Sequence, residues 1–228
     1  MTLWEQPVLE AAAAASCSVM IVIQKRGLML NTLSVGVPDS KIARETTDLA
    51  RHVCPPFLFN HCLRTFWLAD KLAVSGLRFD REIVYIASML HDVGVLEPYD
   101  HGRWFEVDGA QAARDFLAEH MYPPEKIEVV WDAIALHTTT QLAACKPHEV
   151  ALVNLGAAAD AVGLRIGELD PKFVRELIEE FPRLDFPDKW RQTLVEHVKR
   201  NRTRPVSPFF ESIKQATNLF TNNPLDTV

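Results

Sequence analysis

Cysteine is scarce in this sequence, and its spacing fits no disulfide framework. Cys17, Cys54, Cys62 and Cys145 lie far apart and make no CxxC pair. A small domain stapled by disulfides is therefore excluded. Reduced thiols are the state that this use of cysteine favours, so we expect a cytoplasmic protein.

A long membrane-spanning run is also missing. The apolar run from Val8 to Ile23 is interrupted by Glu10, has no basic residue ahead of it and is short for a span of roughly 20 residues. It also lacks the charged start of a signal peptide. We interpret it as a packing segment, within one subunit or across the interface of a homo-oligomer, and expect no membrane partner.

Positive charge is limited as well. Lys and Arg number 24 against 30 Asp and Glu, which gives a formal net charge of -6. General affinity for nucleic acid or anionic membrane needs concentrated basic residues, so we expect neither partner. The basic stretch from Lys199 to Arg204 is interpreted as a solvated helix end. A small-molecule substrate is the partner we expect.

The chain does contain a series of amphipathic segments of helical length, each bounded by Pro, Gly or a capping residue. Asp39 or Ser40 and Asp80 are suitable N-caps, and no comparable series of alternating strands appears. We expect helices over residues 40–53, 57–75, 80–92, 107–120, 123–137 and 149–162 and from about 170 and 187, with a frayed tail from 222. This pattern predicts an all-α fold in a single domain.

Four potential ligands stand in apolar helical contexts. His91 and Asp92 follow the apolar stretch Ile83 to Leu90, His61 lies within the 57–75 segment, and Asp160 follows a nearly apolar run. A buried carboxylate is costly unless a cation or strong donors compensate it. Each residue alone also fits a structural role: His61 as a core histidine bonded to a backbone carbonyl, and Asp160 as an ion pair with Arg165 or another base.

Together these residues form the pattern His-x29-His-Asp-x67-Asp. It resembles the HD superfamily of metal-dependent hydrolases, whose shared fold is a helical bundle. The resemblance covers about residues 37–205 and implies a divalent metal ion held by His61, His91, Asp92 and Asp160. We therefore predict a packing segment over 1–36, an HD catalytic domain over 37–205 and a C-terminal helix and tail over 206–228.

The number and identity of the metal ions follow from the same resemblance. HD branches with two metals place a histidine four residues ahead of a Gly-Ala pair, where this chain has Phe105 ahead of Gly109-Ala110. We expect one ion, although His101, His120 or His148 could supply a further ligand if the loop folds unexpectedly. Two nitrogen and two oxygen ligands suit zinc, iron, manganese or nickel, and we expect zinc first among them.

A narrower resemblance is to the cyanamide hydratase-like HD proteins. The segments that carry it are Val37-Pro38-Asp39-Ser40, Asn60-His61-Cys62-Leu63-Arg64, Phe105-Glu106-Val107-Asp108-Gly109-Ala110, Asp132-Ala133-Ile134-Ala135-Leu136-His137-Thr138 and Phe181-Pro182-Arg183. The cyclic-dinucleotide phosphodiesterase branch tends to have a lysine three residues after the His-Asp pair, where this chain has Val95. The subgroup implies a hydratase, a lyase that adds water to a small nitrile-type substrate.

Several further residues are candidates for the substrate pocket or for support of the ligands. His137, at a helix end, is a catalytic candidate or a histidine bonded to backbone, and Arg64 orients Asp92 or Asp160 or forms a structural ion pair. Phe105, with Trp104 and Trp67, lines a pocket or belongs to the core. Glu106 and Asp108 either face the pocket or stabilise the start of a helix.

The leading functional hypothesis is a mononuclear metal-dependent enzyme that activates water for addition to a nitrile carbon and converts cyanamide to urea. Asp92, or Asp160, would accept the proton and His137 would donate one to the developing nitrogen anion. The alternative enzyme is an HD phosphohydrolase acting on a nucleotide or another phosphate ester. A third alternative is a sensor or scaffold that keeps the metal for stability.

Overall fold

The described part of the chain is built from helices. The computed structural model describes residues 36–201, 207–209 and 223–228, and no β-strand occurs within these ranges. The chain divides after Val37 into two units, and the second, Pro38–Val228, contains every element given below. The predicted all-α fold is confirmed. The N-terminal packing segment and most of the C-terminal segment lie outside the described ranges, so the predicted domain boundaries stay predictions.

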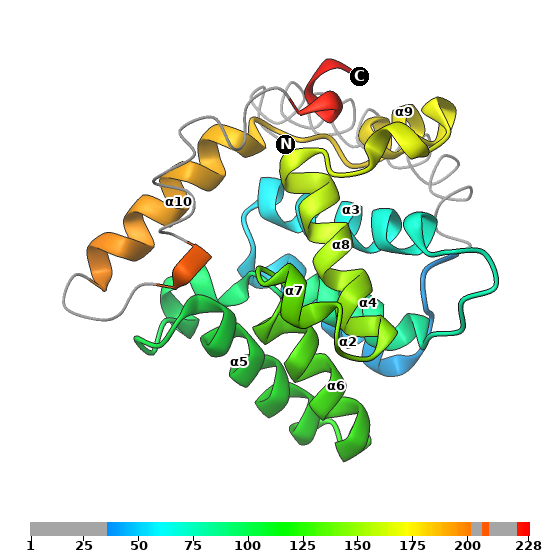
Figure 1. Ribbon diagram of the computed structural model, residues 1–228. Coiled ribbons are helices and arrows are strands. Elements are labelled where there is room, and N and C mark those ends of the chain that lie inside the picture. Colours follow the sequence, from blue (N-terminus) through cyan, green and yellow to red (C-terminus); the bar gives the residue numbers. More distant parts are fainter. Residues whose placement is uncertain (1–35, 202–206, 210–222) are drawn as a thin grey trace, which may run out of the picture. The chain divides into compact units, whose positions relative to one another are not determined.

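The elements follow one another along Pro38–Val228 as α-helices and short 3₁₀ turns (Figure 1). They are α2 (Lys41–Val53), α3 (Pro56–Leu72), α4 (Arg81–Leu90), η2 (Val93–Val95), η3 (Glu97–Tyr99), α5 (Phe105–Glu119), α6 (Pro124–Ala135), α7 (Thr140–Ala143), α8 (His148–Val162), η4 (Ile166–Glu168), α9 (Pro171–Glu180), α10 (Phe186–Arg200) and η5 (Pro224–Thr227).

Local sequence signals account for many of the helix boundaries. The Ser40 hydroxyl accepts from the Ala43 N–H at 3.1 Å, and the Asp80 carboxylate accepts from the Glu82 N–H at 3.0 Å. Pro55 precedes the first residue of α3, and Gly163 ends α8 with a positive φ of 77°. One boundary differs in a way that matters. Because α4 ends at Leu90, the His91-Asp92 pair lies just after the helix rather than on its last turn.

The centre of the fold is the packing of α3 against α8, which crosses it in Figure 1. Most residues of both helices are buried, and most of these buried residues are apolar. Gly156 of α8 makes the close approach possible. A Cβ atom there would meet the Thr65 carbonyl oxygen and would come within 2.9 Å of the Ala69 Cβ. This contact sets the separation between the helix that carries His61 and the helix that carries Asp160.

The first turn of α5 lies directly against the turn that follows His91-Asp92. A Cβ atom at Gly94 would meet the Phe105 carbonyl oxygen, and one at Gly109 would stand 3.3 Å from the His91 carbonyl oxygen. Only glycine permits this approach of two backbones. The approach places Phe105 and the residue after it beside the His-Asp pair.

The expectations of no membrane-spanning helix and of reduced cysteines can be compared with the described residues. None of the described helices combines the length and the apolar character needed to cross a bilayer. Cys54, Cys62 and Cys145 are free thiols, and the first two are buried. Cys17 and the apolar run Val8 to Ile23 lie outside the described residues.

We expect Gly156→Ala to lower the free energy of unfolding, because the Thr65 carbonyl in the backbone of α3 cannot move aside. Overpacking of this kind costs about 1–3 kcal/mol, which exceeds the gain of about 1 kcal/mol from alanine in a helix. Gly167→Ala is the matched control, since a Cβ atom there meets nothing within 4 Å. Urea unfolding monitored by circular dichroism measures both, and a Gly156→Ala midpoint equal to that of the control contradicts the packing argument.

Candidate metal centre

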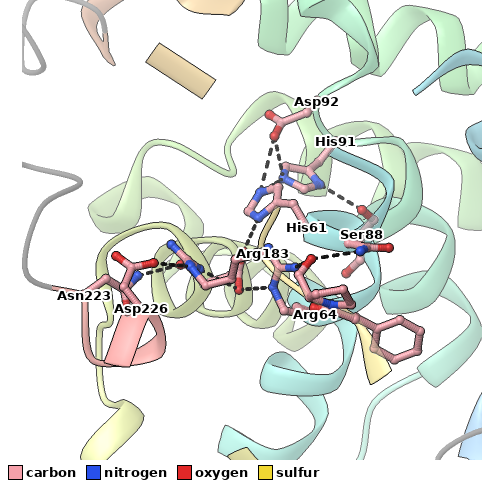
Figure 2. A network of polar contacts seen from close by, with 12 residues as sticks. His61, Arg64, Ser88, His91, Asp92, Arg183, Asn223 and Asp226 are labelled. Carbon is pink, nitrogen blue, oxygen red and sulfur yellow. Dashed lines mark hydrogen bonds and ion pairs between the residues drawn. The ribbon is translucent and has the colours of Figure 1, made fainter. Parts of the chain in front are cut away.

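Three predicted ligands converge where the N-terminal half of α3 meets the residues directly after α4. His61 Nε2 lies 3.1 Å from His91 Nε2 and 3.4 Å from Asp92 Oδ2, and His91 Nε2 lies 3.1 Å from the same oxygen (Figure 2). All three side chains are buried. One ligand atom from each lies within 4.8 Å of the others, a grouping that can hold a metal ion. The structure therefore brings together residues that are 30 positions apart in the sequence.

Hydrogen bonds on the far sides of the imidazole rings fix which nitrogens face the centre. His91 Nδ1 lies 2.8 Å from the Ser88 carbonyl oxygen, which can only accept, so Nδ1 carries the proton. His61 Nδ1 lies 2.6 Å from Asp160 Oδ2 and is protonated for the same reason. In neutral rings this leaves a lone pair on each Nε2. Two lone pairs and a carboxylate facing one another are favourable only with a positive charge between them, which a metal ion or a proton on one ring supplies.

The electrostatics of the same atoms agree with this conclusion. Burial lowers the pKa of His61, but hydrogen bonds and attraction from Asp160 and Asp92 outweigh it, so this pKa lies above its ordinary value. Burial alone would raise the pKa of the Asp92 carboxyl, yet His91, His137 and His61 together hold it well below its usual range. The centre thus attracts positive charge, and metal binding would displace a proton from it.

His137 is a fourth group that faces the centre. Its Nδ1 donates to the Ile134 carbonyl oxygen at 2.6 Å, which leaves the Nε2 lone pair directed to Asp92, 3.4 Å from Oδ1. The backbone bond of His137 is thus present, and the ring also faces Asp92, whereas its catalytic role stays a prediction. Asp92 Oδ1 is buried and has no hydrogen-bond partner among the described residues. An acceptor without a donor, beside three imidazoles, fits a divalent metal ion.

Asp160 lies on the other side of the His61 ring from His91 and Asp92. Its Oδ2 accepts from His61 Nδ1 and from Arg64 Nη2 at 2.8 Å, and its Oδ1 accepts from Arg64 Nε at 2.6 Å. Although burial raises the pKa of the Asp160 carboxyl, Arg64 and His61 hold it far below its usual range. In this arrangement Asp160 orients His61, and its role as a direct ligand stays a prediction. Arg64 forms the ion pair that the sequence offered as one alternative.

The partner of Asp160 is not Arg165, which the sequence offered as one candidate base. Arg165 bonds Glu168 at 2.6 Å in the next 3₁₀ turn. Beyond Arg64, the second basic partner is Arg183, whose Nη1 lies 2.8 Å from the Asp160 carbonyl oxygen and 3.3 Å from Oδ1. Long side chains from distant segments reach this position, whereas Arg165 is held by its local neighbour.

The polar network continues into the C-terminal residues, as Figure 2 shows. Arg183 Nε donates to Asp226 Oδ1 at 2.6 Å, and Asn223 Nδ2 donates to the Asp160 carbonyl oxygen at 2.8 Å. Asn223 and Leu225 are buried, so the expectation of a frayed tail is wrong for residues 223–226. Sequence reasoning missed Asn223 and Asp226 because nothing in a short polar segment indicates a partner 63 positions away. Arg183 could have been found from the sequence, since it belongs to Phe181-Pro182-Arg183, one of the segments that carry the resemblance to cyanamide hydratase-like proteins.

Aromatic side chains contact two of the histidines at the centre. The Phe186 ring stacks on the His61 ring with centroids 4.5 Å apart, and Trp190 stacks on Phe186. The Phe105 ring meets His137 edge-on at 5.6 Å. Of the three aromatic residues suggested by the sequence, only Phe105 lies here. Trp104 is 42% exposed, and Trp67 packs against Phe66.

The two acidic residues at the start of α5 have different surroundings. Asp108 accepts from the backbone N–H groups of His101 and Arg103 and from Arg103 Nε at 2.6 Å, so it anchors the preceding loop. Glu106 accepts from the hydroxyls of Thr138, at 2.8 Å, and Ser207, at 2.5 Å. Glu106 therefore lies next to the His137 segment, whereas Asp108 is directed to the loop.

The histidines named as substitutes for a second metal ligand lie elsewhere. His101 and His148 are exposed. His120 bonds the Phe116 carbonyl oxygen and lies 3.7 Å from Glu45. Across the described ranges, His61, His91 and Asp92 form the one grouping of His, Cys, Asp or Glu side chains that can hold an ion. A single ion remains the expectation.

We expect Asp160→Asn to weaken metal binding by about 10–100-fold, the usual effect of losing the partner that orients a histidine ligand. Asp188→Asn is the control, because that carboxylate pairs with Arg191 on the surface of α10. Competition with a chelating dye measures the affinity. Complete loss of the metal would instead identify Asp160 as a direct ligand, and an unchanged affinity would contradict both roles.

Comparisons with known proteins complete the description of this centre. The HD domain family matches residues 58–206, a range that includes His61, His91, Asp92 and Asp160. An uncharacterized protein of Clostridium beijerinckii is 31% identical over 62 residues, which are 27% of this chain and 40% of that protein. That likeness is local and carries no information on activity. Since the family match covers well over half of the sequence and contains the whole candidate centre, the chain belongs to the HD-domain family.

Proposed function

We propose that this HD protein adds water to a small uncharged nitrile-type substrate, as the resemblance to cyanamide hydratase-like proteins implies. The observation that carries the proposal is that the basic side chains near the candidate metal centre already bond carboxylates and carbonyl oxygens of the protein. Arg64 directs Nε and Nη2 to Asp160 and Nη1 to the carbonyl oxygens of Phe181, at 2.9 Å, and Pro182. A phosphate ester needs basic groups that are free to offset its charge, whereas an uncharged nitrile does not.

The residues present define separate tasks in such a reaction. His61, His91 and Asp92 would hold a divalent ion, which when bound lowers the pKa of a water molecule and polarises the substrate. Asp92 Oδ1, which has no other partner in the described structure, is placed to orient that water or accept its proton. The rings of Phe186 and Phe105 lie against His61 and His137, where they would limit the access of bulk water.

His137 is suited to carry a proton at Nε2. Its ring is oriented by the bond from Nδ1 to the Ile134 carbonyl oxygen, and its own carbonyl oxygen accepts from Asn154 Nδ2 at 2.7 Å. A histidine fixed at two points can accept a proton at one position and return it to a developing nitrogen anion. This supports the assignment of His137 as a general acid beside Asp92.

The alternative, hydrolysis of a phosphate ester, is favoured by one specific atom. Arg183 Nη2 is buried and has no hydrogen-bond partner among the described residues, so it is a donor that a phosphate could use. The same side chain, however, bonds the carboxylates of both Asp160 and Asp226. Its positive charge is already offset, which makes a phosphate the weaker candidate.

The proposed function is tested by adding cyanamide to protein whose metal content has been measured and following urea. Bis(p-nitrophenyl) phosphate is assayed in parallel. We expect urea in proportion to bound metal and no release of nitrophenol above the metal-only background. Nitrophenol without urea would favour the phosphohydrolase, and a protein that takes up neither zinc, iron nor manganese would contradict the metal-dependent mechanism.

We expect His137→Asn to lower kcat by about 10²–10⁴-fold, the usual contribution of a general acid, while the metal stays bound. His120→Asn is the control, since His120 also bonds a backbone carbonyl near a helix end but lies away from the centre. Metal analysis accompanies the kinetics. Loss of the metal in His137→Asn would show a ligand instead of a proton carrier, and unchanged kcat would exclude both.

A further inference from the structure

Two buried carboxylate oxygens in the described structure have no hydrogen-bond partner. They are Asp92 Oδ1 and Glu106 Oε2. The first is explained by the candidate metal centre, to which Asp92 contributes. The second is not explained by any contact described above, although Glu106 is only 2% exposed. Buried acceptors without a donor are rare in folded proteins, and this one calls for a donor from outside the chain.

Glu106 contacts the residue that follows His137 in the chain. Its Oε1 accepts from the Thr138 hydroxyl at 2.8 Å, and Thr138 directly follows His137. The preceding residue, Phe105, meets the His137 ring edge-on, and its carbonyl oxygen lies against Gly94 in the turn after Asp92. The two unpartnered oxygens therefore belong to one residue that contacts His137, Asp92, and one that contacts Thr138, Glu106.

The charge of Glu106 is also uncompensated within the described structure. Its partners are two neutral hydroxyls, Thr138 and Ser207, whereas Asp108, two residues later, has Arg103 and two backbone N–H groups. A carboxylate buried with so few donors is costly unless a ligand supplies the rest. Because an ionised carboxylate can only accept, the missing group is an N–H or O–H donor.

We propose that Glu106 Oε2 binds an N–H group of the substrate and so restricts the site to small uncharged molecules with an amino group beside the reacting carbon. The proposal rests on the proposed function for the identity of the reaction, but not for the binding contact itself. The same carboxylate repels phosphate and carboxylate anions. An analogue with a methyl group in place of the amino group would leave the Glu106 carboxylate buried without a donor. The free-energy cost of that unpaired group is how binding sites reject analogues that lack a hydrogen-bonding group.

Acetamide and acetone test the contact without turnover, because they have similar shapes and differ by an amino group in place of a methyl group. Saturation-transfer NMR of their methyl protons, on zinc-loaded protein, compares the two affinities. We expect acetamide to bind about 10–100-fold more tightly than acetone, as for one hydrogen bond to a charged acceptor. Equal binding of the two ligands overturns the proposal, whatever any variant does.

Glu106→Gln then assigns the preference to this side chain. The amide keeps the size of Glu106 and an oxygen for the Thr138 and Ser207 hydroxyls, but presents a donor where Oε2 was. We expect the preference for acetamide over acetone to fall to about one, with the metal content unchanged. A preference retained in Glu106→Gln overturns the assignment.

Glu82→Gln is the matched control. Glu82 also lies in the first turn of a helix, α4, and accepts from a hydroxyl, Tyr122 Oη, at 2.9 Å. We expect it to keep the wild-type preference for acetamide, and a loss there equal to that in Glu106→Gln would contradict a specific contact. If cyanamide is not hydrated but acetamide is still preferred through Glu106, the reaction is wrong and the binding contact stands.

Discussion

The hydrogen bond between His61 Nδ1 and Asp160 is the contact on which the rest of the centre depends. It places the proton on the outer nitrogen of His61 and leaves the inner nitrogen as a ligand atom, 3.1 Å from that of His91. Without this bond the ring could rotate or take the other tautomer, and the lone pair would be lost. The side chains that bond Asp160 hold its carboxylate in the position that this hydrogen bond requires.

Burying Asp160 completely has a large desolvation cost, which explains the density of donors around it. Two guanidinium groups, Arg64 and Arg183, and the amide of Asn223 reach it from three segments of the chain. Such networks contribute little net stability compared with an apolar core, but they are strongly disrupted when one member is removed. Because the members lie far apart in sequence, the geometry of the centre is complete only when α3, α8 and the C-terminal residues are all in place.

The sequence predicts the local features of this structure well and the long-range contacts poorly. Helix starts at Ser40 and Asp80 follow from capping chemistry between neighbouring residues. The candidate ligands His61 and Asp160 are found in the sequence because each is a polar residue in an apolar helical segment. The stacking of Phe186 on His61 and the docking of Asp226 on Arg183 depend on how distant helices pack. No spacing rule contains that information, so these residues are found only in three dimensions.

The arrangement of charge supports the proposed combination of a metal ion with an uncharged substrate in one centre. Around Asp160, the negative charges of Asp160 and Asp226 are matched by Arg64 and Arg183. Nearer to His137, Asp92 and Glu106 are buried carboxylates with no Lys or Arg partner in the described structure, whereas the buried Asp108 pairs with Arg103. The imidazoles that face Asp92 are ligands only when neutral. A divalent ion would balance these two carboxylates and leave no surplus positive charge. An anionic substrate would then be desolvated without compensation, whereas a neutral molecule that donates to Glu106 would meet a balanced site.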